Sequence, residues 1–558
     1  MHVDPGSGLF LLLAVCPVLL LTTVGVESKP PAASDRVGDG MRLRSRWAWS
    51  AIVFGIIVRI WQYGLNRSVW VDEACLALNL IHRQYAELLR PLDYHQGAPL
   101  GFLFVERLLI EHWGPSEYTL RFFPLLAGIA SLFMFYGVAR RVVSPGALAV
   151  AMGLFAIAPP LIYYSSELKQ YSCDVAVALL LYLIALSPPV ANWGYLRIAG
   201  LGLIGAVVIW FSHPAVFVLA SIATVFTVLL VAERNWKQLA RFAAAYVLVL
   251  ASMAVVYFIS LRNLVADNYL LKYWTDNFMP LPPKSVTDLK WFYDSFFEFF
   301  RSPVGFSFAG LSALAFIVGG HHLYARARDR TKFWLLLLPW VFALLASSLH
   351  RYPFGGRLAL FLVPSAIMLI AEGADRVRLA TQRDAWVVGY LLIGLLFIDP
   401  AVYLLHHFAK PHVLVTSPGI MLPEEIKPAL SYVRAHERPT DMIYIFRDAL
   451  PAYEYYSDIE HIHDNNLLPG IAEGSDSKDY VEDLGRLRGR QVWVIFSHVN
   501  GVQSDAPKYT RFYLDTMGKR LDVFSSPGAV AYLYDLSIPE PVNAPPAFSA
   551  RPKQQSRN

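Results

Sequence analysis

Long apolar stretches, separated by short polar connections, fill the chain from residue 47 to about residue 406. A helix needs about 20 mainly apolar residues to cross the roughly 30 Å of hydrocarbon in a bilayer. Eleven stretches approach this length, and we interpret each as a membrane-spanning helix. The predicted spans are residues 47–64, 119–139, 147–163, 171–187, 197–212, 214–232, 241–261, 305–323, 332–349, 357–374 and 385–406.

Basic residues are distributed unequally between the two sets of connections. One set contains 16 lysines and arginines, whereas the short connections of the other contain only Arg67, Lys169, Arg351 and Arg357. Because Lys and Arg collect in cytoplasmic loops, the first set is assigned to the cytoplasm. The outer face then receives residues 65–118, 163–171, 211–214, 262–304, 350–357 and those after 406. Nearly every polar cluster of functional character falls in these outer segments.

Composition agrees with a polytopic membrane protein. Of the 558 residues, 55% are hydrophobic and 16% are charged, and the mean hydropathy is +0.41. Soluble enzymes carry roughly 25% charged residues, so a soluble or disordered protein is excluded. Three cysteines without a CxxC pair exclude a disulfide scaffold. The net charge of +5 is modest, and no nucleic-acid partner is expected.

Both ends of the chain differ from the spans. Leu9–Val26 is apolar, but no basic residue precedes it, as one would in a signal peptide. Met41 begins MRLRSRWAW, which suits the start of a first helix, so we expect residues 1–46 to be an extension that is not native before Met41. The Pro-rich residues 539–558 are expected to form a disordered tail.

The first outer segment begins with WVDEA, which contains the adjacent carboxylates Asp72 and Glu73. A charge at the edge of the hydrocarbon is costly unless it is paired or functional. The alternative interpretation is a helix start, because acids suit the first turn. Residues 74–90 and 100–113 then predict two amphipathic helices at the interface.

Three further outer segments contain candidate binding residues. In the second, Glu167 and Lys169 lie between Tyr163 and Tyr171; such a group suits an anionic headgroup and a hydroxyl acceptor, or simply an aromatic belt with snorkelling charges. In another, Arg351 and Arg357 flank two glycines, which suits phosphate but also a tight turn. His213 and Tyr352 are candidates to line the same cavity. Residues 262–304 are rich in aromatic and acidic residues and are interpreted as a mobile substrate loop.

The order and spacing of these motifs resemble those of the GT-C class of membrane glycosyltransferases, in particular the protein O-mannosyltransferase and aminoarabinose transferase group. The resemblance covers roughly residues 47–375. It rests on VDEA (71–74), GAPLGFLFVERLLIEHWGPSEYTLRFFPLLAGIASL (97–132), YYSSELKQYS (163–172) and YPFGGRLALFLVP (352–364).

The resemblance implies an all-α polytopic membrane domain, here residues 47–406, that catalyses inverting transfer of a hexosyl or pentosyl unit. The donor would be a polyprenyl-phosphate sugar. The acceptor would be a lipid, polysaccharide or protein on the periplasmic, extracytoplasmic side of a bacterial inner membrane. Such a carrier cannot leave the bilayer, so the site must lie at the interface.

The resemblance also implies roles for individual residues. Asp72 would be the catalytic base, with Glu73 beside it, and Glu167 the second acid, where some relatives carry Asp. Lys169 and Arg357 would contact the donor phosphate. The sequence leaves open whether a divalent cation, Mg or Mn, binds Asp72 or Glu167, and no His/Cys set demands one.

From about residue 407 helix-like and strand-like patterns alternate, which predicts a small outer α/β domain over residues 407–538. The predicted helices are 423–438, 478–488 and 506–519, and the predicted strands are 442–446, 491–497, 520–525 and 529–536. Two other function classes stay open at this stage. One is a transporter or flippase of lipid-linked sugars, which should have ionisable residues near the bilayer midplane and internal repeats; neither is evident. The other is a non-catalytic binder, which would have no need of both Asp72 and Glu167.

Overall fold

The computed structural model describes residues 33–186, 189–409, 424–460, 466–471, 477–497 and 506–537. It divides the chain into two compact units. The larger comprises residues up to 66, 83–114 and 118–421, and the smaller comprises 67–82, 115–117 and the residues from 422 onwards. The predicted extension before residue 33 and the predicted tail lie outside the described residues.

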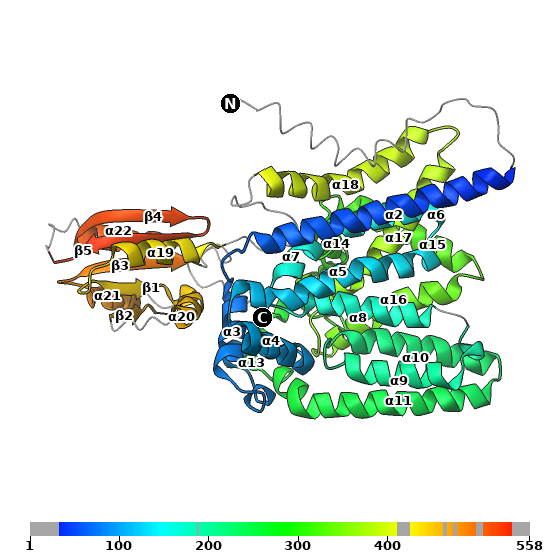
Figure 1. Ribbon diagram of the computed structural model, residues 1–558, viewed down its shortest axis with the longest axis horizontal. Coiled ribbons are helices and arrows are strands. Elements are labelled where there is room, and N and C mark those ends of the chain that lie inside the picture. The colour runs from blue at the N-terminus through cyan, green and yellow to red at the C-terminus, as the bar shows by residue number, and fades with distance from the viewer. Residues whose placement is uncertain are drawn as a thin grey trace. The chain divides into compact units, whose positions relative to one another are not determined.

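The larger unit is a bundle of helices (Figure 1). Its long helices are α2 (Ala33–Gly64), α5 (Glu117–Val142), α6 (Pro145–Ile157), α8 (Tyr171–Ala185), α9 (Tyr195–Val208), α10 (Ala215–Ala232), α11 (Trp236–Val256), α15 (Ala309–Ala325), α16 (Arg330–Ser348), α17 (Val363–Ala380) and α18 (Trp386–Ala409). Shorter ones include α4 (Leu100–Trp113), α7 (Pro159–Tyr163), α13 (Asn268–Tyr273) and α14 (Val286–Arg301).

Every predicted span coincides with helix in this unit. Six described helical segments are long and apolar enough to cross a membrane, and a seventh arises if α6 and α7, bent by 50°, are one span. The helices α8, α9 and α15 are apolar but shorter. A membrane domain is therefore confirmed, whereas the total of eleven spans stays a prediction.

Helix boundaries follow local chemistry. The Ser144 hydroxyl accepts a hydrogen bond from the backbone of Ala147, and Pro145 occupies the first turn of α6, where a missing N–H costs nothing. Pro159 and Pro160 end that helix and open α7. Ser285 starts α14 with a reciprocal capping box to Asp288.

The helix α17 lies at the centre of the bundle, and 94% of its apolar window is buried. It packs along α15 at backbone contact. A methyl group at Gly319 of α15 would overlap the Leu369 carbonyl, and one at Gly373 of α17 would overlap the Ala315 carbonyl. Small residues allow this approach, which gives membrane helices their dispersion contacts.

The smaller unit is an α/β domain. Its five-stranded sheet has the order β2-β1-β3-β5-β4, from Leu467–Pro469, Met442–Ile445, Gln491–Ser497, Ala529–Asp535 and Lys519–Ser526. Strands β2, β1 and β3 are parallel, and β5 and β4 continue the sheet antiparallel. Helices α19 (Ile426–His436), α20 (Leu450–Ile459), α21 (Ser477–Gly485) and α22 (Ala506–Met517) connect them. The predicted fold class is thus confirmed; the sequence patterns identified four of the five strands but not β2 or α20.

The helix α3 (Val71–His82) belongs to this smaller unit. It packs against α20, and the Val69 amide donates to the Tyr456 hydroxyl over 3.0 Å. Glu425 accepts hydrogen bonds from both the amide and the hydroxyl of Ser68. The first interfacial helix, predicted for residues 74–90, therefore ends at His82, and only a short turn (Glu87–Leu89) follows.

We predict that Gly319→Ala lowers the melting temperature of the purified protein in detergent, because the new methyl group forces α15 away from α17. Overpacking of this kind costs about 1–3 kcal/mol. The matched control is Gly310→Ala in the same helix, where a methyl group would meet nothing within 4 Å. Equal melting temperatures for the two variants would show that the close approach does not stabilise the bundle.

Candidate functional site

The predicted binding segment 163–171 follows a broken helix. The prolines at 159 and 160 stop α6, and a short α7 leads into a 3₁₀ turn at Tyr164–Ser166. Glu167 is extended and ends that turn, and α8 begins at Tyr171. All residues from 158 to 175 are buried, so the polar groups of this turn lie inside the protein rather than on a snorkelling rim.

Lys169 is 4% exposed and Glu167 is 1% exposed. The Lys169 ammonium donates to the Gln96 side-chain oxygen over 2.6 Å. Burying a cation is expensive unless polar partners surround it. The protein therefore holds a lysine charge inside the larger unit and fixes its position with an amide from the loop before α4.

Arg357 joins the same region through an aromatic ring. Its guanidinium carbon lies 5.8 Å from the centre of the Tyr171 ring, and the ring of Tyr164 packs edge-on against Tyr171. Tyr352 donates a hydrogen bond from its hydroxyl to the Leu358 carbonyl over 2.7 Å and packs on Phe217. The short helix Gly356–Leu362, which carries Arg357, packs against α8.

The other predicted site residues of this unit divide into two groups. Tyr163 is buried and contacts Tyr164 edge-on. Arg351, in contrast, is exposed, and its backbone amide caps the end of α16 at Ala346. Lys169, Arg357 and the tyrosines thus form a cationic and aromatic region that is buried at Lys169, Tyr163, Tyr164 and Tyr171 and half-buried at Tyr352 and Arg357, whereas the Arg351 side chain is exposed.

A buried polar cluster beside this region was missed by sequence reasoning. It consists of Glu106 from α4, Asp174 from α8, and Ser212 and His213 from the turn before α10. Asp174 interacts electrostatically with Ser212 and Tyr352, and Glu106 with Cys173. The α4 start is fastened to this turn, because the Gly101 amide donates to the Trp210 carbonyl over 2.7 Å.

Burial shifts the pKa of two members of this cluster towards their uncharged forms. Glu106 is completely buried, neither carboxyl oxygen has a hydrogen-bond partner among the described residues, and this burial raises its pKa well above the usual value. Burial also lowers the pKa of His213 to about 4. Both shifts reduce the charge that Glu106 and His213 carry in the native protein.

Sequence signals for the missed residues do exist. Glu106 lies three residues after Leu103 and four before Ile110, so it shares the buried face of its amphipathic helix. Asp174 is an acid inside a predicted span, which by itself marks a candidate site. The prediction treated all charged residues of 100–113 as interfacial, and therefore did not identify Glu106 as a residue of the buried face.

Asp72 and Glu73 lie in the first turn of α3, in the smaller unit. The Glu73 carboxylate is buried and accepts the Trp70 amide over 3.1 Å, so it caps the helix as the structural alternative expected. Asp72 is half-buried, with one carboxyl oxygen fully enclosed. The catalytic role of both residues stays a prediction.

The described residues contain no group of three or more His, Cys, Asp or Glu side chains that could hold a metal ion. They therefore do not fit a preformed metal centre, and the chemistry below uses none. What this region can do is bind an anion, because it holds a buried ammonium that contacts an amide and a half-buried guanidinium that lies over a ring.

We predict that Glu106→Gln stabilises the protein at neutral and alkaline pH. A carboxyl whose pKa is raised on folding must stay protonated in the native state, while the unfolded chain ionises above its ordinary value of 4.5. Native stability is therefore lost as pH rises above that value, by up to roughly 1.4 kcal/mol per pH unit. The amide removes this loss.

Melting temperatures of wild type and Glu106→Gln, measured in detergent from pH 5 to pH 9, check this. The advantage of the variant should grow with pH and shrink towards pH 5. A difference independent of pH would mean that Glu106 is ionised in the native protein.

No protein-family model and no curated protein matches the sequence. Solved structures do match. ArnT from Cupriavidus metallidurans in the apo state is 14% identical, with a TM-score of 0.50, over 89% of this chain and 99% of that one. Its structure bound to undecaprenyl phosphate matches 91% of this chain and all of that one, again at 14% and 0.50.

The archaeal oligosaccharyltransferase AglB from Archaeoglobus fulgidus is 13% identical, with a TM-score of 0.47, over 88% of this chain and 74% of that one. At this identity the likeness concerns the fold, and the argument rests on the ArnT structures, which match from end to end. The expectation from the motifs is confirmed at that level: the chain has the fold of the GT-C membrane glycosyltransferases.

Proposed function

We propose that this protein is an inverting glycosyltransferase that moves a sugar from a polyprenyl-phosphate carrier to an acceptor at the outer face of the membrane. The observation that carries the proposal is that two cations, the buried Lys169 and the half-buried Arg357, lie in the outer segments of a GT-C fold. A neighbour of the same fold was solved with undecaprenyl phosphate, which supports a lipid-linked donor.

The donor phosphate is assigned to Lys169 and Arg357. Lys169 supplies a compact charge held by Gln96, and the Arg357 guanidinium offers a planar fork above Tyr171. Together they stabilise the charge that grows on the phosphate as it leaves. The outer location follows from the excess of Lys and Arg in the opposite connections, and we place the protein in a bacterial inner membrane.

The transfer requires one proton acceptor. An acceptor hydroxyl attacks the anomeric carbon from the face opposite the phosphate, a new C–O bond forms as the C1–O(phosphate) bond breaks, and the configuration inverts. Asp72 takes the hydroxyl proton, which is typically worth ~10²–10⁴-fold in rate. The polyprenyl phosphate leaves as the anion and needs little acid assistance. The role of Asp72 rests on its VDEA motif, and Glu167 is proposed as the second acid.

The transporter alternative finds little support in the buried charges of the spans. Glu372 and Asp375 are both buried in α17, yet both bind Ser144 at the start of α6, over 2.6 Å and 2.8 Å, and pair with Arg376 and Arg378. Acids engaged this way stabilise helix ends. They are not placed to carry a substrate across the bilayer midplane.

We predict that Asp72→Asn reduces consumption of the sugar donor at least 100-fold, because the amide cannot accept the proton. The measurement is release of free polyprenyl phosphate, followed by mass spectrometry, with a panel of polyprenyl-phosphate sugars and host membrane extract. The matched control is Glu482→Gln, an exposed carboxylate of the same unit. Unchanged turnover in Asp72→Asn with wild-type melting temperature would remove Asp72 from the mechanism.

A second prediction compares the two arginines of the 351–357 segment. Arg357→Gln should weaken binding of undecaprenyl phosphate roughly tenfold or more, the size expected for one lost charge-assisted contact, and Lys169→Gln should do the same. Arg351→Gln, at an exposed position, should change the affinity less than twofold. Microscale thermophoresis in detergent measures this, and a larger loss in Arg351→Gln than in Arg357→Gln would contradict the assignment.

A further inference from the structure

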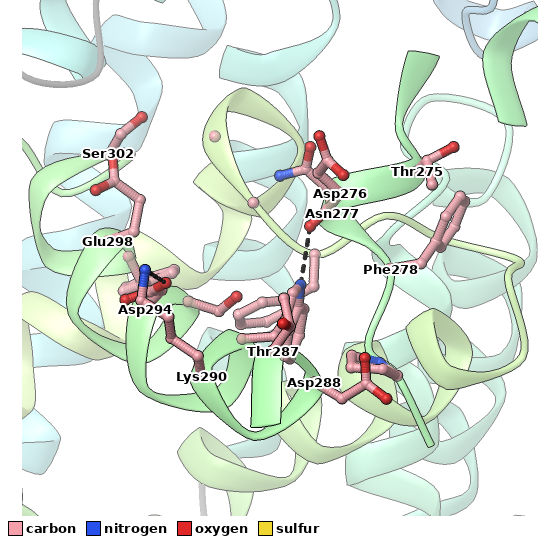
Figure 2. A pocket seen from close by; sticks show the side chains of 17 residues that line it. Thr275, Asp276, Asn277, Phe278, Thr287, Asp288, Lys290, Asp294, Glu298 and Ser302 are labelled. Atoms are coloured by element: carbon pink, nitrogen blue, oxygen red, sulfur yellow. Dashed lines mark hydrogen bonds and ion pairs between the residues drawn. The ribbon is translucent and has the colours of Figure 1, made fainter. Parts of the chain in front are cut away.

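A cavity of about 650 Å³ lies in the outer segment between α11 and α15 (Figure 2). One wall is the segment Thr275–Pro280, a second is one side of α14, and the third is Phe354–Gly356. The volume is in the range of pockets that bind small molecules or one to two sugar units. The residues assigned to the donor phosphate, Lys169 and Arg357, do not line this cavity.

The walls are fastened to one another before any ligand arrives. The Trp291 indole donates to the Asp276 carbonyl over 2.9 Å, which fixes α14 to the Thr275–Pro280 wall. On the other side, the Phe354 amide donates to the Asn277 carbonyl over 2.8 Å. A preformed cavity loses less entropy on binding than one that must be assembled.

Only one side of α14 faces the cavity. Thr287, Trp291, Asp294, Ser295 and Glu298 recur at intervals of three or four residues and line it. Tyr293, on the same helix, is 65% exposed and does not line it. The helix therefore presents two aromatic rings, Trp291 and Phe299, together with hydroxyls and carboxylates to the cavity, whereas Tyr293 points to the surroundings.

Gly355 and Gly356 bring bare backbone to the third wall. A methyl group at Gly355 would collide with the side-chain nitrogen of Asn277. Gly356 has a φ of 49°, a conformation that favours glycine. These two glycines keep the Asn277 amide and the backbone open to the cavity, where a ligand hydroxyl can reach both.

The charge of the lining excludes phosphate. Four carboxylates (Asp276, Asp288, Asp294 and Glu298) face one ammonium, that of Lys290. Asp288 is occupied by its capping box, and Asp294 pairs with Lys290 over 3.4 Å. The Asp276 carboxylate has no ion-pair or hydrogen-bond partner within the described parts of the chain. An anionic headgroup would be repelled here, so the cavity does not suit the donor phosphate.

We propose that this cavity binds an uncharged sugar unit of the acceptor. A flat indole stacks on the apolar face of a sugar ring, and carboxylate, amide and hydroxyl groups around it accept and donate hydrogen bonds to the ring hydroxyls. The assignment rests on the proposed transferase function. The order of residues agrees with this assignment, because Arg357, which is assigned to the donor phosphate, directly follows Gly355 and Gly356 of the cavity wall.

The test uses the full-length protein in nanodiscs and saturation-transfer NMR with a panel of methyl glycosides and short neutral oligosaccharides. Wild type should saturate at least one member of the panel. Trp291→Leu should weaken that binding roughly tenfold, as expected for losing one anchoring aromatic face, while Trp291→Phe keeps part of it. The matched control, Tyr293→Leu, should bind like wild type, and undecaprenyl phosphate should bind all four proteins equally.

Several results would overturn the site. The proposal is wrong if wild type transfers saturation to no sugar of the panel, or if Trp291→Leu binds the sugar as well as wild type does. It is also wrong if Trp291→Leu loses binding of undecaprenyl phosphate. Calcium displacing the sugar from the cavity would show a cation site instead. The proposed function fails separately: if wild type binds a sugar through Trp291 yet consumes no polyprenyl-phosphate sugar, the sugar site stands and the transferase does not.

Discussion

Hydrocarbon offers a polypeptide no hydrogen-bond partners, so the chain can place chemistry only where its helices end. This constraint organises the larger unit. The Lys169 segment exists because two prolines stop α6, and His213 lies in the turn before α10. The segment with Arg357 begins where α16 ends. The break at 158–175 is buried, which explains how Lys169 is held within a largely apolar unit, whereas the break after α16 is exposed at Arg351 and half-buried at Arg357.

Electrostatics then separate two kinds of ligand within the same unit. The region around Lys169 and Arg357 contains two basic side chains, and burial shifts the pKa of the nearby Glu106 and of His213 towards their uncharged forms. The cavity on α14 is acidic. This difference in charge suits a reaction between a phosphate-linked donor and a hydroxyl-bearing acceptor. The acidic cavity repels the donor phosphate, and the cationic region does not favour an uncharged acceptor.

The sequence alone was sufficient for the architecture where one physical signal dominates. Hydrophobic length predicted the helices of the bundle, and alternating patterns predicted β1, β3, β4 and β5. It was insufficient where burial depends on partners far away in the chain. Glu106 was interpreted as interfacial, but the packing of α4 against the turn at Trp210 encloses it. The short strand β2 was missed because three residues carry no periodicity.

The roles of the candidate site residues stay a prediction, but the structure shows where these residues lie. Glu167, Lys169 and Arg357 were selected from the sequence, and all three are at least partly buried in one unit. Arg351 was selected together with Arg357 but is more exposed. The sequence does not predict this difference, because both arginines flank the same pair of glycines. Glu73 shows the opposite case: its carboxylate caps α3, so adjacency to Asp72 in the sequence does not imply a shared role.

The stereochemistry of the transferred sugar tests the central claim most directly. Wild-type protein would be given a polyprenyl-phosphate sugar of known anomeric configuration, and the product would be examined by NMR together with the released polyprenyl phosphate. The account predicts one polyprenyl phosphate released for each sugar transferred, with inversion at the anomeric carbon. Donor that is bound but recovered chemically intact, or product with retained configuration, would contradict it.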